Sequence, residues 1–190
     1  MAGKWRHDIF QFFTIVSMVK MEDKKSDANF DANKAHYVVA TCIIVKGGKY
    51  LIAKRADWEK NSPGKWTVPG GKLETSDYQN REYDTGGNQW YNVVEDLVRR
   101  EVKEEVGLEI KNIGYVCSLA YLRHDGIPTV VISLFAEPVS DTVELCDALT
   151  EFKWVDLAEA KSVDLIDGIY EEIEILEKHL KTGKGMCWGK

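Results

Sequence analysis

The spacing of hydrophobic positions divides the chain into strand-like and helix-like segments. Six segments rich in β-branched and aromatic residues predict β-strands, since such side chains suit a pleated, half-buried surface. They are residues 37–45, 49–54, 66–68, 112–123, 128–137 and 150–155. Residues 92–106 and 163–181 carry apolar positions at helical spacing and predict helices. This mixture predicts an α/β or α+β sandwich, formed by one domain over residues 36–181.

The two ends of the chain lack these patterns. Residues 9–19 (IFQFFTIVSMV) follow a basic start and predict an amphipathic helix, too short to span a bilayer. A secretory or membrane role, or translation from Met21, are the alternatives for this segment. The polar residues 22–35 predict a linker, so that 1–35 form an N-terminal extension. Residues 182–190 include three glycines and predict a loose tail.

The predicted helix at 92–106 carries carboxylates on its apolar face. With 100° per residue, one arc holds five aliphatic residues: Val94, Leu97, Val98, Val102 and Val106. Glu101 and Glu105 fall inside this arc, and Glu104 lies at its border. Two interpretations stay open: a solvated acidic patch paired with Arg99 or Arg100, or a site for a hard cation such as Mg²⁺ or Mn²⁺.

Composition and net charge exclude several classes of function. The chain has 190 residues, 44% of them hydrophobic and 29% charged, as in soluble globular proteins. Its net charge of −6 argues against a basic DNA-binding surface, and an acidic protein that handles a polyanion needs local neutralisation, usually by a divalent metal. Four separated cysteines form no Cys-x-x-Cys pair, which excludes a zinc ribbon. The cytoplasm is the expected compartment, and no membrane association is expected.

Two segments together resemble a known family. Residues 100–108 read Arg-Glu-Val-Lys-Glu-Glu-Val-Gly-Leu, and residues 69–74 read Pro-Gly-Gly-Lys-Leu-Glu. They resemble the Nudix box, G-x5-E-x7-R-E-U-x-E-E-x-G-U, in which U is aliphatic. The resemblance implies a Nudix-like α/β/α sandwich with a mixed sheet between helices. It also implies hydrolysis of the diphosphate linkage in a nucleoside diphosphate joined to another group.

The resemblance also implies site residues. Glu101, Glu104 and Glu105 would ligate Mg²⁺ or Mn²⁺ together with the carbonyl of Gly71, and Arg100 would orient the glutamates. The general base is expected to be Glu104 or, in a later loop, Glu151. A metal-activated water makes a covalent nucleophile unnecessary.

Four further residues are candidates for contacts with a small nucleotide substrate. Arg55 and Lys72 are placed to hold phosphate, and Trp58 to stack on a base. His124 lies between two predicted strands, where contact with substrate and simple exposure are the two alternatives. The substrate itself stays open among nucleoside triphosphates, ADP-ribose, nucleotide sugars, dinucleoside polyphosphates and a capped RNA end. A homodimer is one expected assembly, since many Nudix proteins dimerise.

The box departs from the family pattern in one place. Gly71 and Arg100 are 29 positions apart, where the pattern has 14, so 15 residues are inserted. Counting from Gly71 puts Asp77 at the pattern's first glutamate, whereas counting back from Arg100 puts Asn92 there. The insertion, roughly residues 77–91, is either a lid or substrate wall or an ordinary surface loop.

Two other functions compete with the hydrolase. A Nudix-like nucleotide sensor without catalysis is compatible with the insertion and the displaced first glutamate, but the three retained glutamates argue against it. An isomerase acting on an isoprenoid diphosphate would need a cysteine at the metal site. Cys117 is the candidate for that role, although its apolar surroundings in sequence favour packing in a strand.

Overall fold

A computed structural model describes residues 34–183. The predicted helix at 9–19, the linker at 22–35 up to residue 33 and the tail from 184 lie outside the described residues. Among residues 34–183, no helix is long and apolar enough to cross a membrane.

Every predicted strand is present in the structure. The strands are β1 (Tyr37–Lys46), β2 (Lys49–Arg55), β3 (Trp66–Thr67), β4 (Gly70–Lys72), β5 (Ile110–Leu122), β6 (Pro128–Pro138) and β7 (Leu149–Val155). The helices are η2 (Thr75–Asp77), α1 (Val93–Val106), α2 (Leu157–Ala160) and α3 (Ile169–Thr182). β1 and β2 pair antiparallel and form a hairpin across Gly47 and Gly48.

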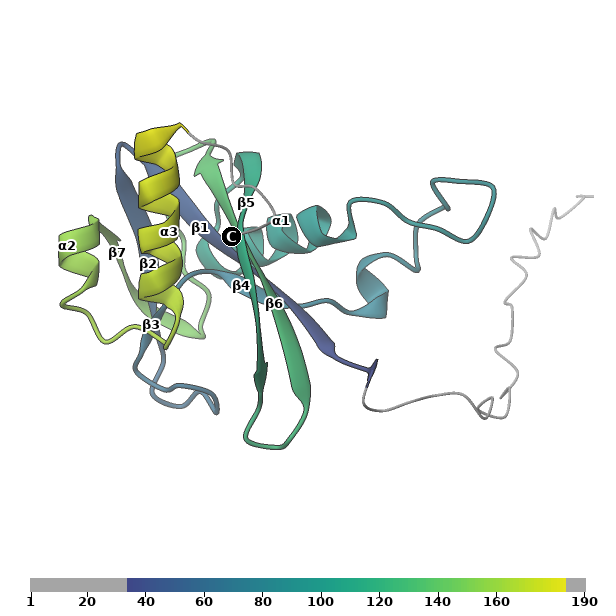
Figure 1. Cartoon of the computed structure of the whole chain (residues 1–190), viewed down its shortest axis with the longest axis horizontal. Coiled ribbons are helices and arrows are strands. Elements are labelled where there is room, and N and C mark those ends of the chain that lie inside the picture. The colour runs from purple at the N-terminus through teal and green to yellow at the C-terminus, as the bar shows by residue number, and fades with distance from the viewer. Residues whose placement is uncertain (1–33, 184–190) are drawn as a thin grey trace, which may run out of the picture. The chain divides into compact units, whose positions relative to one another are not determined.

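Strand β1 organises the sheet, because it has partners along both edges (Figure 1). On one edge it runs parallel to β6, from Tyr37 opposite Thr129 to Ile44 opposite Ala136. On the other edge its first half pairs with β4 and its end pairs with β2. The main strand order is β3-β2-β1-β6-β5, with β7 also paired to β2. The sheet is therefore mixed, and β4 is held beside the centre of the domain.

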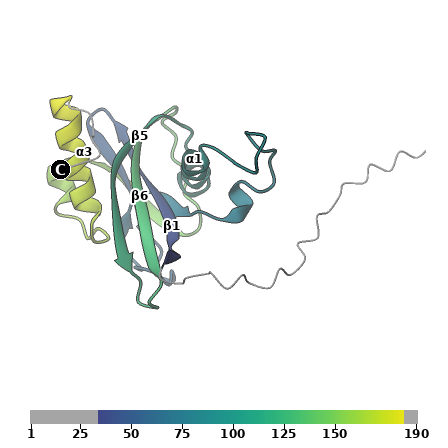
Figure 2. The same ribbon diagram turned by 45° about the vertical axis from the view of Figure 1, so that its right-hand side comes forward.

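Helices cover both faces of this sheet, and Figure 2 shows α1 and α3 on opposite sides of β1, β5 and β6. Four aliphatic residues of α1 are buried against one face: Leu97, Val98, Val102 and Val106. On the other face α3 buries Ile169, Ile173 and Leu176. The predicted sandwich of a mixed sheet between helices is confirmed.

Two segments differ from the sequence-based prediction. Residues 163–168 are not helical, because their backbone pairs with β3: the Trp66 N–H donates to Asp164 O, and the Ile166 N–H donates to Trp66 O. Helix α3 begins only after Gly168, whose φ of +96° suits glycine. The short helix α2 was not predicted, and its N-terminus is capped by Asp156.

Gly70 and Gly71 of the Pro-Gly-Gly segment belong to strand β4 rather than to a turn. Gly70 and Gly71 pair with Thr41 and Ala40 of β1. A side chain at Gly70 would overlap the Ala40 carbonyl, so only glycine lets β4 lie this close. Glycine here marks a close approach of two backbones rather than a change of chain direction.

Candidate active site

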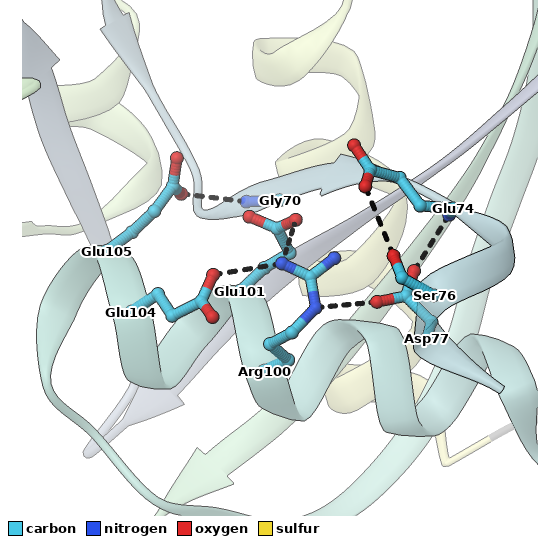
Figure 3. A network of polar contacts seen from close by, with 8 residues as sticks. All are labelled: Gly70, Glu74, Ser76, Asp77, Arg100, Glu101, Glu104 and Glu105. Atoms are coloured by element: carbon cyan, nitrogen blue, oxygen red, sulfur yellow. Dashed lines mark hydrogen bonds and ion pairs between the residues drawn. The ribbon is translucent and has the colours of Figure 1, made fainter. Parts of the chain in front are cut away.

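Helix α1 presents its glutamates to the edge of β4 (Figure 3). Because the aliphatic residues of the helix face the core, Glu101 on the same face is only 13% exposed, whereas Glu104 at the border is 59% exposed. A Cβ at Gly71 would overlap the Glu101 carboxylate, so the glycine is needed for this approach. The structure therefore places Glu101 beside Gly71.

Arg100 connects three carboxylates. Its Nε donates a hydrogen bond of 2.8 Å to Asp77 Oδ1, and its Nη1 lies 3.0 Å from Glu101 Oε1 and 2.9 Å from Glu104 Oε2. Charge-assisted bonds of this kind fix both partners more firmly than neutral hydrogen bonds do. The guanidinium thus holds the acids of α1 and η2 in one orientation, as the predicted orienting role of Arg100 requires.

Asp77 is the acidic partner that sequence counting left undecided. Its side chain is 7% exposed, and Oδ2 accepts a hydrogen bond of 2.8 Å from the Glu74 N–H. The structure therefore places the acid counted forward from Gly71 against Arg100, whereas Asn92 lies at the N-terminus of α1 in a left-handed conformation. In the sequence, counting forward from Gly71 already pointed to Asp77. Only the contact with Arg100 in the structure favours Asp77 over Asn92.

Glu105 points to the backbone of β4 rather than to Arg100. Its Oε2 accepts a hydrogen bond of 3.0 Å from the Gly70 N–H. Burial raises the pKa of Glu105 to about 7, although this hydrogen bond opposes the shift. Burial also raises the pKa of Glu101, against the opposing charge of Arg100. Both acids would gain from a cation that replaces the lost solvation.

The donor set suits a hard divalent cation. Mg²⁺ and Mn²⁺ prefer carboxylate and carbonyl oxygens, which Glu101, Glu104, Glu105 and the backbone of Gly71 supply. Within residues 34–183, no three acidic, histidine or cysteine side chains converge closely enough to surround one ion. Glu101 and Glu104 are instead turned toward Arg100. The residues therefore fit the ion by chemistry, and binding it requires these side chains to turn.

A cavity of about 700 Å³ adjoins β4 and includes Gly70 and Gly71 in its wall. Three of the predicted substrate-binding residues line it together: Arg55, Lys72 and His124. Arg55 donates from Nη2 to Glu59 at 2.7 Å and from Nε to the Asn61 carbonyl at 2.8 Å. The positive charge of Arg55 also lowers the pKa of Glu105, against the effect of burial. Arg55 therefore lines the cavity and also acts on one of the box glutamates.

The other predicted residues lie apart from this group. Glu151 is on β7, where Oε1 lies 3.1 Å from Lys54 Nζ. Trp58 is 67% exposed and does not line the 700 Å³ cavity. Cys117 lies on β5 opposite Ser133 and packs with the α3 layer, and burial raises its pKa to about 11. The isomerase hypothesis requires a cysteine at the metal site. Cys117 is a neutral thiol on the sheet face opposite α1, so it does not meet this requirement.

Comparisons with known proteins agree with this architecture. The model of the family described as NUDIX domain matches residues 34–175. A search of the curated proteins gave no match.

Solved structures similar to this chain include three that illustrate the range of the fold. A MutT NUDIX hydrolase from Burkholderia pseudomallei is 22% identical over 75% of this chain and 99% of its own, with a TM-score of 0.60. The NUDIX domain of Shewanella oneidensis NrtR, in complex with ADP ribose, is 19% identical over 84% and 99%, with a TM-score of 0.58. A C. elegans Ap4A hydrolase in a binary complex is 19% identical over 77% and 98%, with a TM-score of 0.56.

Proposed function

Because this chain belongs to the Nudix family of hydrolases, we propose that it is a Mg²⁺- or Mn²⁺-dependent pyrophosphohydrolase of nucleoside diphosphate derivatives. The observation that carries the proposal is the approach of Glu101 to Gly71 and of Glu105 to Gly70, two glycines in the wall of a 700 Å³ cavity. Acidic ligands for a cation and cationic side chains for phosphate lie on either side of the short strand β4. Hydrolysis of a diphosphate in this way requires both groups, one to hold the metal and one to bind the phosphates.

Each box residue has a chemical role in this proposal. Glu101, Glu104 and Glu105 would hold the divalent ion with the Gly71 carbonyl. When bound, such an ion supplies positive charge to the phosphate oxygens and lowers the pKa of a coordinated water. Arg100 keeps Glu101 and Glu104 oriented through its contacts at 3.0 and 2.9 Å. On the cavity side, Arg55 and Lys72 bind phosphate oxygens, and His124 contacts the group joined to the diphosphate.

Glu104 is the proposed general base. It is the most exposed of the three box glutamates, so a water molecule reaches its carboxylate without displacing core side chains. Glu151 is the second candidate, and it would have to leave its ion pair with Lys54. Trp58, exposed in the loop after β2, is proposed to stack on a substrate base as the loop closes.

The substrate is proposed to be a small nucleotide. One similar structure is a NUDIX domain bound to ADP ribose and another is an Ap4A hydrolase, so both compounds belong in a screen. We also propose a cytoplasmic location, no DNA binding and a homodimer as the assembly to test. The proposed domain extends over residues 36–181.

A substrate screen tests the hydrolase. Nucleoside triphosphates, ADP-ribose, nucleotide sugars and dinucleoside polyphosphates are incubated with and without Mg²⁺ or Mn²⁺, and released phosphate or pyrophosphate is measured. We expect turnover of one class, lost at least about 100-fold in the Glu104→Gln, Glu105→Gln double variant. Glu95→Gln, in the first turn of α1, is the matched control and retains activity.

A negative result has a defined meaning. If the wild-type protein binds nucleotides tightly but hydrolyses none of these compounds with either metal, the chain is a nucleotide sensor and the hydrolase proposal is wrong. If turnover survives in the double variant, the box glutamates do not carry the reaction.

A further inference from the structure

The charge of the 700 Å³ cavity is opposite to that of the whole chain. The chain has a net charge of −6, yet among residues 34–183 no aspartate or glutamate lines the cavity. Its wall includes four basic side chains: Arg55, Lys60, Lys72 and Arg123. A concentration of cations in a concave site of an acidic protein favours an anionic occupant, because field lines are focused there.

Two of these cations share one aromatic ring. Lys72 Nζ lies 5.6 Å and the Arg123 guanidinium 5.5 Å from the centroid of Tyr37. Tyr37 begins β1, whereas Lys72 is on β4 and Arg123 follows β5, so three separate segments converge. Placing two like charges around one ring is unfavourable unless an anion joins them or solvent screens them. Asp125 accepts two hydrogen bonds from Arg123, of 3.1 and 2.9 Å.

Lys60 and Lys72 have no comparable acidic partner. Within the part of the chain that the structure describes, neither ammonium group lies within ion-pair distance of a carboxylate. Both lysines are exposed, so each alone costs little, but together they line the same cavity as Arg55 and Arg123. The cavity therefore has uncompensated positive charge after Glu59 and Asp125 are counted.

Strand β4 connects this positive charge to the glutamates. Successive residues of a strand point to opposite faces, so Gly71 faces Glu101 while Lys72 faces the cavity. No side chain at Gly70 or Gly71 stands between the two sides. A chain of phosphates crossing the bare backbone there would have one group at the glutamates and the next beside Lys72.

We infer that the cavity between β4 and the β5–β6 hairpin contains a binding site for a phosphate group beyond the scissile diphosphate. The inference rests on the proposed function and names its substrate class: nucleotides with three or more consecutive phosphates, such as nucleoside triphosphates or dinucleoside polyphosphates. Lys72 and Arg123 bind the additional phosphate, and Lys60 adds to the attraction from the opposite wall. ADP-ribose and nucleotide sugars have no third phosphate and leave this site unused.

Binding of inorganic probes tests the site without turnover. Tripolyphosphate and pyrophosphate are titrated calorimetrically into the full chain in EDTA and low salt. We expect tripolyphosphate to bind at least about tenfold more tightly than pyrophosphate. Lys72→Gln and Arg123→Gln should each weaken tripolyphosphate about tenfold, as expected for loss of a charge-assisted bond. Lys178→Gln, an exposed lysine of α3, removes the same charge and should change neither affinity.

Kinetics then separate the inference from the proposed function. With a hydrolysed triphosphate, Arg123→Gln should raise KM about tenfold, while KM for ADP-ribose changes less than twofold. Thermal unfolding confirms that each variant is folded. Equal weakening of both probes by Arg123→Gln, or no weakening in either folded variant, overturns the inference, as does better hydrolysis of ADP-ribose than of every triphosphate. Loss of hydrolysis alone, with selective tripolyphosphate binding intact, contradicts only the proposed enzyme activity.

Discussion

At the scale of single residues, the site depends on buried groups that orient one another. Asp77, Arg100 and Glu101 form a chain in which each charge is satisfied by the next, at 2.8 and 3.0 Å. Such networks make large contributions only when every member is present, because a buried charge without a partner is costly. Asp77 does not line the 700 Å³ cavity. We propose that its role is to position Arg100.

Replacing Asp77 tests this positioning role. Asp77→Ala leaves Arg100 Nε without its 2.8 Å partner, so we expect the free energy of unfolding to fall by about 1–3 kcal/mol. We expect kcat to fall about tenfold while KM changes less than twofold, because the glutamates lose orientation and the cavity is untouched. Steady-state kinetics and chemical denaturation give these quantities.

Two matched variants make the result specific. Asp77→Glu keeps the carboxylate and should recover most of kcat, which a purely structural role of the segment would not predict. Asp147→Ala removes an exposed aspartate and should alter neither quantity. A kcat unchanged in Asp77→Ala would show that Arg100 needs no support from η2.

At the scale of elements, α1 and α3 both bury acidic side chains, but in different surroundings. The acids of α1 face β4 and the candidate metal site, whereas α3 buries Glu172 against the opposite face of the sheet. Ser133 Oγ donates a hydrogen bond of 2.7 Å to Glu172 Oε2. Burial raises the pKa of Glu172, the bond to Ser133 opposes this, and the charge of Glu171 adds to it. Cys117 lies near Glu172. Burial and the charge of Glu172 raise the pKa of Cys117 to about 11, so its thiol remains neutral.

The pH dependence of stability should reveal this buried acid. Since the pKa of Glu172 is higher in the folded than in the unfolded chain, its contribution to stability is lost as pH rises through the folded pKa. Glu172→Gln removes the ionisation and keeps an acceptor for Ser133. We therefore expect its unfolding midpoint at pH 8 to exceed that of the wild type by about 2–4 °C, and the difference to vanish near pH 4.

An exposed acid on the same helix is the control for this prediction. Glu174→Gln, one residue beyond the buried Ile173, should shift the midpoint little at either pH. A Glu172→Gln midpoint below that of the wild type at pH 8 would mean that the ionised carboxylate is stabilising, contrary to its raised pKa.

At the scale of the whole molecule, the insertion between η2 and α1 is an appendage of the sandwich. The Trp90 ring packs at a tilt against both Tyr78 and Tyr83, with ring centroids 5.0 and 4.7 Å apart, so the loop is ordered by its own side chains. Arg81 ties it to α1 through Asp96 at 3.5 Å. None of its residues from 78 to 91 belongs to the buried core or lines the 700 Å³ cavity. The arrangement favours a surface loop over a wall of this cavity.

Removing the insertion should leave the fold intact. Deleting residues 78–92 restores the family spacing between Asp77 and Arg100 and shortens a loop without removing core surface. We expect the unfolding midpoint to change by less than about 4 °C, which corresponds to roughly 1 kcal/mol for a domain of this size. Hydrolysis of the substrate found in the screen should stay within about threefold. Scanning calorimetry and kinetics measure both.

A full-length variant accompanies the deletion. Trp90→Ala keeps the chain length and removes the stacking, so its effect separates order within the loop from the presence of the loop. A deletion that lowers the midpoint by more than about 10 °C, or abolishes activity while remaining folded, would show that the insertion is part of the site.

The sequence by itself determined the elements with strong local patterns. Segments rich in β-branched and aromatic residues predicted every long strand, and the aliphatic arc of residues 92–106 predicted both α1 and the anomalous placement of Glu101 and Glu105. The box motif predicted the family, because the spacing of acids on a helix is a local property that survives the insertion. These features depend on neighbours within a few residues, and a sequence displays such neighbours directly.

Only the tertiary structure decided which distant groups meet. Pro-Gly-Gly has the same local signals whether it turns or pairs, and the pairing of β4 became visible only from the close approach of β1 and Glu101 to its glycines. Asp77, rather than Asn92, contacts Arg100 because of the path that the chain takes through the 15 inserted residues. Local spacing does not determine that path. The grouping of Lys72 with Arg123 likewise depends on the order of strands in the sheet. Contacts of this kind join residues far apart in sequence, and local spacing does not encode them.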